Sequence, residues 1–96
     1  MMNYTVNLKG VKTVYTLHQA LKDGLHLPDY YGMNMDALWD CISSADIEIP
    51  ATIYIEGINS LPKDLHEKKE ILIELLNDAV KWYKETDMTL NVVYID

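Results

Sequence analysis

Apolar and polar residues follow one another along this chain with two different periods, which separates predicted strands from predicted helices. Strict alternation indicates a strand with one face in a core, and it marks residues 4–8, 51–56 and 89–94. Apolar residues three or four positions apart indicate helices, and they mark roughly residues 14–23, 35–45 and 69–84. Ser60 followed by Pro62 predicts a further short helix towards Glu67, because serine caps helices and proline suits their first turn.

The order of these elements predicts an α/β fold. The 96 residues, 49% of them hydrophobic, supply one small core, so residues 1–96 are expected to form a single domain. Strands separated by helices pair in parallel through right-handed connections. The predicted fold is a small three-stranded parallel sheet packed against about four helices, in the order βααβααβ. The pattern leaves the order of the strands within the sheet open.

The segment from Leu27 to Ser44 combines a turn with a short acidic helix, and its pattern is the hardest to explain by structure alone. Pro28 and Gly32 interrupt any earlier helix, and Asn34 is a suitable N-cap for the next one. One face of this helix is an apolar stripe that we expect to be buried, and it consists of Met35, Leu38, Ile42 and Ala45, with Cys41 at its edge.

A second face of the same helix is acidic. Trp39, Ser43, Asp36 and Asp40 share an arc about 100° wide. Asp36 in the first turn complements the helix dipole. Asp40 has no such benefit, because it lies four residues further on and repels Asp36. The sequence has no Lys or Arg between Asp23 and Pro50 to neutralise the pair. This pattern favours a surface that binds a cationic partner, although a solvated polar face would look similar.

Charge and composition narrow the classes of function. A net charge of −7 argues against nucleic acid as a ligand, and it suits a basic protein partner. The single cysteine, Cys41, is expected in the core and fits a reducing compartment. No segment resembles a membrane span or a signal peptide, so we expect a cytoplasmic protein. His18 and His26 lack the spacing of metal ligands, and we expect them at the surface or the core boundary.

Enzymatic chemistry finds little support in the sequence. The four glycines are scattered and form no phosphate-binding loop. Asp36 and Asp40 could act as an acid and base pair or hold Mg²⁺, but nothing in the sequence supplies the further ligands or a pocket. Ser43 and Ser44 lack the sequence context of a nucleophile. We therefore expect no enzymatic activity, no cofactor and no metal.

The run from Leu17 to Ser44 resembles the barstar family, the intracellular inhibitors of barnase-type ribonucleases. The specific part of the match is LPDYYGMNMDALWD, which joins a Tyr-Tyr-Gly turn to an Asp-x-x-Trp-Asp helix. The resemblance implies a three-stranded parallel sheet covered by helices. It also implies a protein that inserts this helix into the active site of a basic secreted ribonuclease, where the carboxylates replace RNA phosphates.

The resemblance also implies a role for each matched residue. Asp40 would be the central phosphate mimic, Asp36 would pair with a second basic group, and Tyr30 would stack on a catalytic histidine of the nuclease. The remaining contacts would come from Asn34, Met35, Trp39 and Ser43, with Ser44 at the end of the helix. Asp78 is the nearest counterpart of a contributing glutamate in the last long helix.

Three positions depart from the family pattern. Ser44 stands in place of a glycine, Ala45 in place of a tryptophan that touches the nuclease, and Met33 in place of an acidic residue. These changes bear on which partner is bound, and a protein–protein interaction module of the same fold with a non-nuclease partner remains the alternative. We expect a monomer, because one strongly charged patch is poorly suited to a self-complementary interface.

Overall fold

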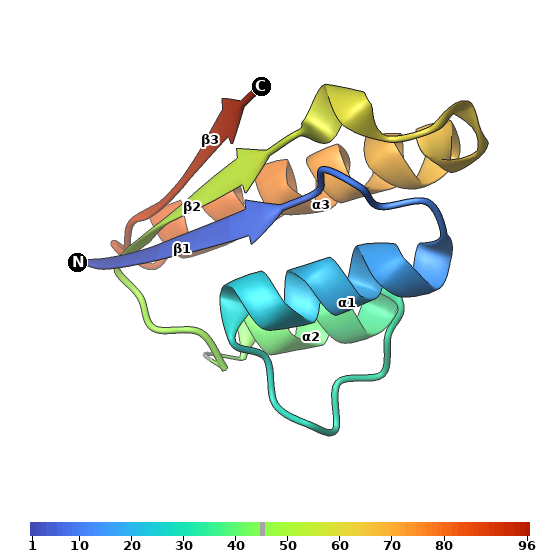
Figure 1. Cartoon of the computed structure of the whole chain (residues 1–96). Coiled ribbons are helices and arrows are strands. Elements are labelled where there is room, and N and C mark those ends of the chain that lie inside the picture. Colours follow the sequence, from blue (N-terminus) through green and yellow to red (C-terminus); the bar gives the residue numbers. More distant parts are fainter. Residues whose placement is uncertain (45) are drawn as a thin grey trace.

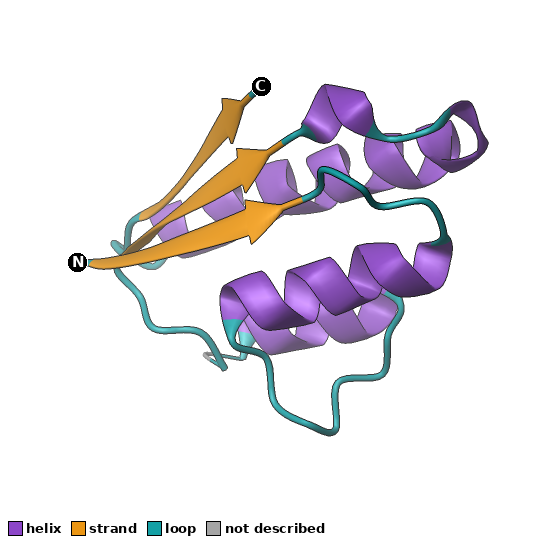
Figure 2. Ribbon diagram, viewed as in Figure 1, coloured by secondary structure: helices purple, strands orange, loops and turns teal. Residues whose placement is uncertain are grey.

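The structure, a computed structural model, describes residues 1–44 and 46–96. Its helices and strands are β1 (Met2–Asn7), α1 (Val14–Leu25), α2 (Met35–Ser43), β2 (Ala51–Glu56), α3 (His66–Lys84) and β3 (Leu90–Ile95) (Figure 2). This α/β order confirms the predicted fold class. Ala45, which we expected to complete the apolar stripe of the acidic helix, lies outside the described residues.

The three strands form one parallel sheet in the order β1-β2-β3. In this register Tyr4 lies beside Ile53, and Ile53 beside Val92. Helix α3 passes behind the strands, whereas α1 and α2 lie together below β1 (Figure 1). The strand order that the sequence left open is therefore the simplest one, with each strand beside its neighbour in the chain.

The core lies between the sheet and the three helices. The central strand β2 contributes Ile53 and Ile55, both fully buried. Each helix contributes a pair of fully buried side chains at helical spacing: Leu17 and Leu21 from α1, Leu38 and Ile42 from α2, Leu72 and Leu76 from α3. The predicted apolar stripes are thus mostly buried, but Met35, at the start of the α2 stripe, is only partly buried.

Helix α1 continues beyond its predicted end. Gly24 belongs to the helix, and the chain turns at His26, whose φ of 54° places it in the left-handed region. A Cβ atom on Gly24 would lie 2.6 Å from the carbonyl oxygen of Thr5. The glycine therefore permits the close approach of α1 to β1 and does not terminate the helix.

The short helix predicted before the last long one is smaller than expected. Two 3-10 turns, η1 (Ile58–Ser60) and η2 (Lys63–Leu65), precede α3, which begins directly at His66. Pro62 stands before η2 in an extended conformation. The predicted cap was thus wrong, because Ser60 ends η1 and Pro62 precedes the first turn of η2. The turn that follows Pro62 joins α3 instead of forming a separate helix.

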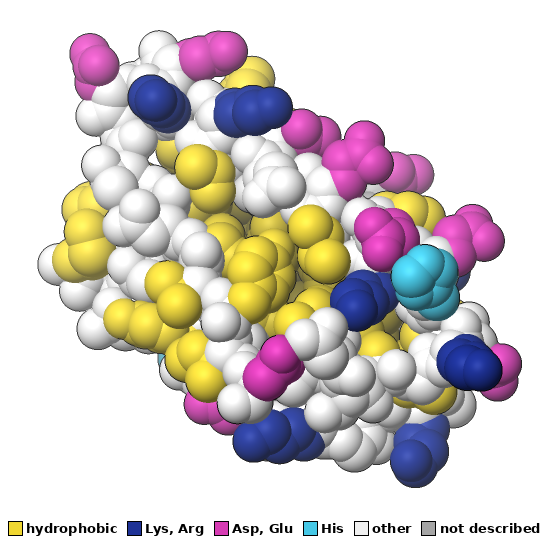
Figure 3. Space-filling model, turned by 90° about the horizontal axis from the view of Figure 1, so that it is seen from above, with side chains coloured by type: hydrophobic (Ala, Val, Ile, Leu, Met, Phe, Trp, Pro, Cys, Tyr) yellow, Lys and Arg dark blue, Asp and Glu magenta, His cyan; other side chains and the backbone are white. Residues whose placement is uncertain are grey.

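Part of the molecule remains open and apolar. Viewed from above, the molecule shows apolar side chains gathered in the middle of the visible face, with charged side chains around the rim (Figure 3). Strand alternation places Tyr54, Val93 and Ile95 on one side of the sheet, and the last two are about two-fifths exposed.

In the described part of the chain, no helix is long and apolar enough to cross a membrane.

Candidate functional site

Helix α2 begins where the sequence predicted. Asn34 is in an extended conformation, and its Oδ1 accepts the backbone N–H of Ala37 at 2.8 Å. Its Nδ2 donates to the carbonyl oxygen of Gly32 at 3.1 Å, which ties the cap to the preceding turn. Because α2 buries Leu38 and Ile42, its other side is directed outwards with Asp36 and Asp40 exposed. We call these two carboxylates the acidic ridge.

The turn before α2 is anchored to α1 through a buried polar contact. The hydroxyl of Tyr31 lies 2.7 Å from Nδ1 of His18 and donates to the carbonyl oxygen of Asn34 at 3.3 Å. The expectation for His18 was wrong, because its exposed fraction is 1%, whereas His26 is exposed as expected. Burial lowers the pKa of His18, and the nearby positive charge of Lys68 lowers this pKa further.

Backbone strain accompanies this turn. Met33, directly before the cap residue, has a φ of 56°, in the left-handed region that non-glycine residues occupy at a cost of roughly 1–2 kcal/mol. Such strain persists only where the surroundings impose it. Here Asn34 imposes it, because its side chain bonds the carbonyl oxygen of Gly32 on one side of Met33 and the N–H of Ala37 in α2 on the other.

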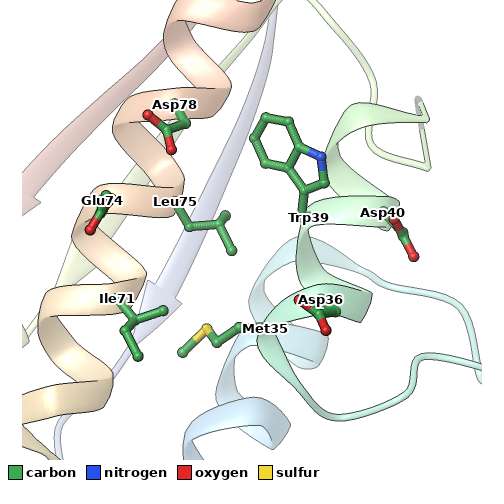
Figure 4. Close-up of a pocket in the computed structure, with 8 residues that line it drawn as sticks. All are labelled: Met35, Asp36, Trp39, Asp40, Ile71, Glu74, Leu75 and Asp78. Carbon is green, nitrogen blue, oxygen red and sulfur yellow. The ribbon is translucent and has the colours of Figure 1, made fainter.

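On one flank of the acidic ridge lies a groove between α2 and α3, with a volume of about 450 Å³. Its apolar lining consists of Met35, Trp39, Ile71 and Leu75, and its carboxylates are Asp36, Asp40, Glu74 and Asp78. Trp39 and Met35 point towards α3, while Asp40 points away from it (Figure 4). The structure thus brings Asp78 to the same groove as four residues of α2, although 38 positions separate it from Asp40 in the numbering.

On the other flank lies a second hollow, of about 410 Å³, between α2 and the Tyr-Tyr-Gly turn. Its lining includes Tyr30, Asp40, Ser44 and Asp46. Tyr30 is 75% exposed, and its hydroxyl donates to the Asp46 carboxylate at 3.3 and 3.4 Å. The negative charge of Asp46 raises the pKa of this hydroxyl. Asp40 borders both hollows and is therefore at the centre of the surface.

The two serines at the end of α2 use their hydroxyls within the helix. Ser43 Oγ donates to the carbonyl oxygen of Trp39 at 2.7 Å, and Ser44 Oγ donates to that of Asp40. Ser44 also lines the second hollow, whereas Ser43 lines neither of the two. A partner that bonds the Ser43 hydroxyl would have to share it with this helix carbonyl.

The carboxylates of the site form no ion pair in the part of the chain that the structure describes, although Lys68 lines a hollow beside Asp36. Among residues 1–44 and 46–96, the ion pairs are Lys22 with Asp29 at 3.9 Å and His66 with Glu70 at 3.7 Å. Neither involves Asp36, Asp40 or Asp78. Nor does any group of three or more His, Cys, Asp or Glu side chains in these residues have the arrangement of a metal site. The ridge therefore presents uncompensated negative charge.

Sequence reasoning missed three contributors to this surface. Asp46 lies in the connection after α2, where turn-forming residues gave no sign of a contact with Tyr30. Glu74 is exposed on α3, and it also lines the groove. Trp82 of α3 lies against Trp39, with ring centroids 6.2 Å apart. Only the packing of α3 beside α2 reveals the last two.

A three-stranded parallel sheet with an acidic, aromatic helix face beside it is the arrangement that the resemblance to the barstar family implies. The family described as Barstar (barnase inhibitor) matches residues 1–95, and the chain therefore belongs to the barstar family. The family consists of ribonuclease inhibitors, not enzymes.

One curated relative covers most of the chain. A protein of Bacillus subtilis (strain 168), named "Putative ribonuclease inhibitor YrdF", is 29% identical over 85 residues, which are 88% of this chain and 92% of the relative. The resemblance that we found in Leu17–Ser44 thus extends over nearly the whole sequence.

Proposed function

We propose that this protein binds a basic, barnase-type ribonuclease and blocks its active site, with the acidic ridge in the positions of RNA phosphates. The observation that carries the proposal is the place of Asp40. It lies on the ridge between two hollows, and no ion pair among the described residues compensates its charge. An uncompensated carboxylate at the centre of an aromatic surface matches an active site that has evolved to bind phosphates with cations.

The chemistry of such a contact favours strong binding. Carboxylates that face arginine or lysine form charge-assisted hydrogen bonds, which are shorter and stronger than neutral ones. Trp39, Met35 and the exposed ring of Tyr30 supply apolar area around the ridge that excludes water from these bonds. The net charge of −7 accelerates the encounter with a basic partner and makes association sensitive to salt.

The proposed partner also suggests where inhibition takes place. An inhibitor of a secreted nuclease protects the cell that makes the nuclease, so we place this binding in the cytoplasm. The buried thiol of Cys41 supports a reducing compartment, because the chain has no second cysteine with which to form an internal disulfide.

Calorimetric titration with a catalytically disabled barnase tests the proposal. We expect tight 1:1 binding that weakens as the salt concentration rises. Asp40→Ala should raise the dissociation constant by about 30-fold or more, the equivalent of about 2 kcal/mol at a hot spot. Asp23→Ala removes the same charge from α1, where Asp23 accepts a hydrogen bond from Gln19, and serves as the matched control.

Two outcomes would contradict the proposal. Equal effects of Asp40→Ala and Asp23→Ala would show that overall charge, not the acidic ridge, determines binding. A folded wild-type protein that does not bind the nuclease would remove this class of partner and favour the alternative, an interaction module of the same fold with a non-nuclease partner.

A further inference from the structure

Trp82 extends the site onto the last turns of α3. Its exposed fraction is 46%, and its ring meets that of Trp39 edge to face, with an interplanar angle of 67°. Large aromatic side chains at the surface are ordinary when they stand alone. Trp82 does not stand alone, because it continues the apolar lining that Trp39 contributes to the groove between α2 and α3.

Acidic residues accompany Trp82 along one side of α3. Glu74 and Asp78 precede it by eight and four positions, and Glu85 follows it by three, so helical spacing places all four side chains along one stripe. Glu74 and Asp78 line the groove (Figure 4). Lys81 is directed elsewhere, because it lines a different hollow beside β3. We call Glu74, Asp78, Trp82 and Glu85 the α3 strip.

The chemistry of the α3 strip selects an arginine. A guanidinium group stacks on an aromatic ring and at the same time donates hydrogen bonds to a neighbouring carboxylate. Trp82 with Asp78 one turn before it and Glu85 one turn after it offers both kinds of contact. A lysine would gain less, because its ammonium group is compact and strongly hydrated.

We propose that Trp82 is a second aromatic contact for the ribonuclease and receives an arginine side chain of that enzyme. This inference rests on the proposed function, because the occupant is part of the same partner. The acidic ridge would then supply the contacts that block catalysis. The α3 strip would determine which ribonucleases are bound tightly, since an enzyme without an arginine at this place gains nothing from it.

Calorimetric titration with catalytically disabled barnase tests the inference with three variants. Trp82→Ala should raise the dissociation constant about tenfold, within the range for a cation–π contact that is removed from water. Tyr15→Ala removes an aromatic side chain of α1 that is more exposed than Trp82, and it should leave the dissociation constant unchanged. Asp40→Ala reports on the proposed function itself. Circular dichroism should show that all three variants remain folded.

The possible failures can be told apart. If Asp40→Ala loses binding and Trp82→Ala does not, the α3 strip makes no contact, but the proposed function stands. If the folded wild-type protein does not bind, the proposed function fails and the inference fails with it.

A double-mutant cycle separates direct contact from support of Trp39. Each arginine of the disabled nuclease is replaced by alanine and titrated with wild type and with Trp82→Ala. Direct contact predicts that the effect of one arginine replacement shrinks at least threefold in the variant. If the effects of Trp82→Ala and of every arginine replacement on the binding free energy are additive, Trp82 contacts no arginine and only positions Trp39.

Discussion

Helices α1 and α2 are both stabilised at their start by a capping side chain, but charged residues are placed in them in opposite ways. Both begin with a side-chain cap, Thr13 for α1 and Asn34 for α2. Helix α1 ends with Lys22 in its last turn, which complements the helix dipole. Helix α2 has no basic residue in its last turn and carries Asp40 there, one turn after Asp36.

This difference identifies the part of the molecule that is not optimised for its own stability. A chain that only had to fold would gain by replacing Asp40, because aspartate is a poor helix former and repels both Asp36 and the dipole. Sequences that specify a fold agree with local rules nearly everywhere, and exceptions concentrate at functional sites. The contrast between α1 and α2 can be tested by experiments, from large effects to small ones.

The largest effects should come from the buried faces, where the two helices are equivalent. Leu21→Ala in α1 and Ile42→Ala in α2 each remove a fully buried side chain. Both should lower the free energy of unfolding by about 2–5 kcal/mol, measured by urea denaturation. A much smaller loss of unfolding free energy for Ile42→Ala than for Leu21→Ala would show that α2 packs loosely on the core. The main difference between α1 and α2 would then be packing, not charge.

The pH dependence of stability tests the hydrogen bond between His18 of α1 and Tyr31 in the turn before α2. Burial and Lys68 lower the pKa of His18, so the unfolded chain takes up this proton first as the pH falls. The stabilisation by neutral His18 is complete above about pH 6.5 and decreases as the pH falls towards the lowered pKa. The slope should not exceed about 1.4 kcal/mol per pH unit from this group.

Urea denaturation between pH 8 and pH 5 measures that slope. His18→Gln should flatten it. An unchanged slope in His18→Gln would assign the pH dependence to other groups.

The N-caps should contribute similarly to the two helices. Thr13→Ala removes the acceptor for the Thr16 N–H, at 3.1 Å, and Asn34→Ala removes the acceptor for the Ala37 N–H, at 2.8 Å. Each should lower the free energy of unfolding by about 1 kcal/mol. In Asn34→Ala, loss of the bond to Gly32 should also weaken binding of the nuclease, because the turn that carries Tyr30 is no longer held. Equal binding by both variants would contradict this role.

The smallest effects concern charge and should differ in sign. Lys22→Ala should destabilise the protein by about 0.3–1 kcal/mol through loss of a favourable dipole contact. Asp40→Ala should stabilise it by about 0.5–1 kcal/mol through better helix propensity and less repulsion. Thermal unfolding of both variants at low salt measures the difference. Destabilisation by Asp40→Ala would mean that this carboxylate has a structural role.

Much of this architecture follows from the sequence because it depends on local chemistry. Period and capping residues predict the strands, the helices and the start of α2 at Asn34. The acidic ridge also follows, since Asp36 and Asp40 share a helix face in any fold. The end of α1 was predicted less well, because Gly24 marks a close approach to Thr5 and local rules favour a helix end there.

The rest depends on contacts between distant segments. His18 is polar, and its burial follows only from the partner that Tyr31 provides thirteen residues later. The pair of Trp39 and Trp82 forms because α3 packs beside α2, and no periodicity specifies that neighbour. The strand order β1-β2-β3 is likewise a property of the whole chain.

The place of Cys41 gives the proposed binding surface its own chemical reporter. It is the chain's single cysteine, and it is buried in α2 where it contributes to the lining of the second hollow beside Asp40. Burial, assisted by Asp46 and Asp40, raises the pKa of this thiol and keeps the reactive thiolate scarce. A thiol reagent should therefore react slowly with this protein. A ribonuclease bound over the second hollow should slow the reaction further.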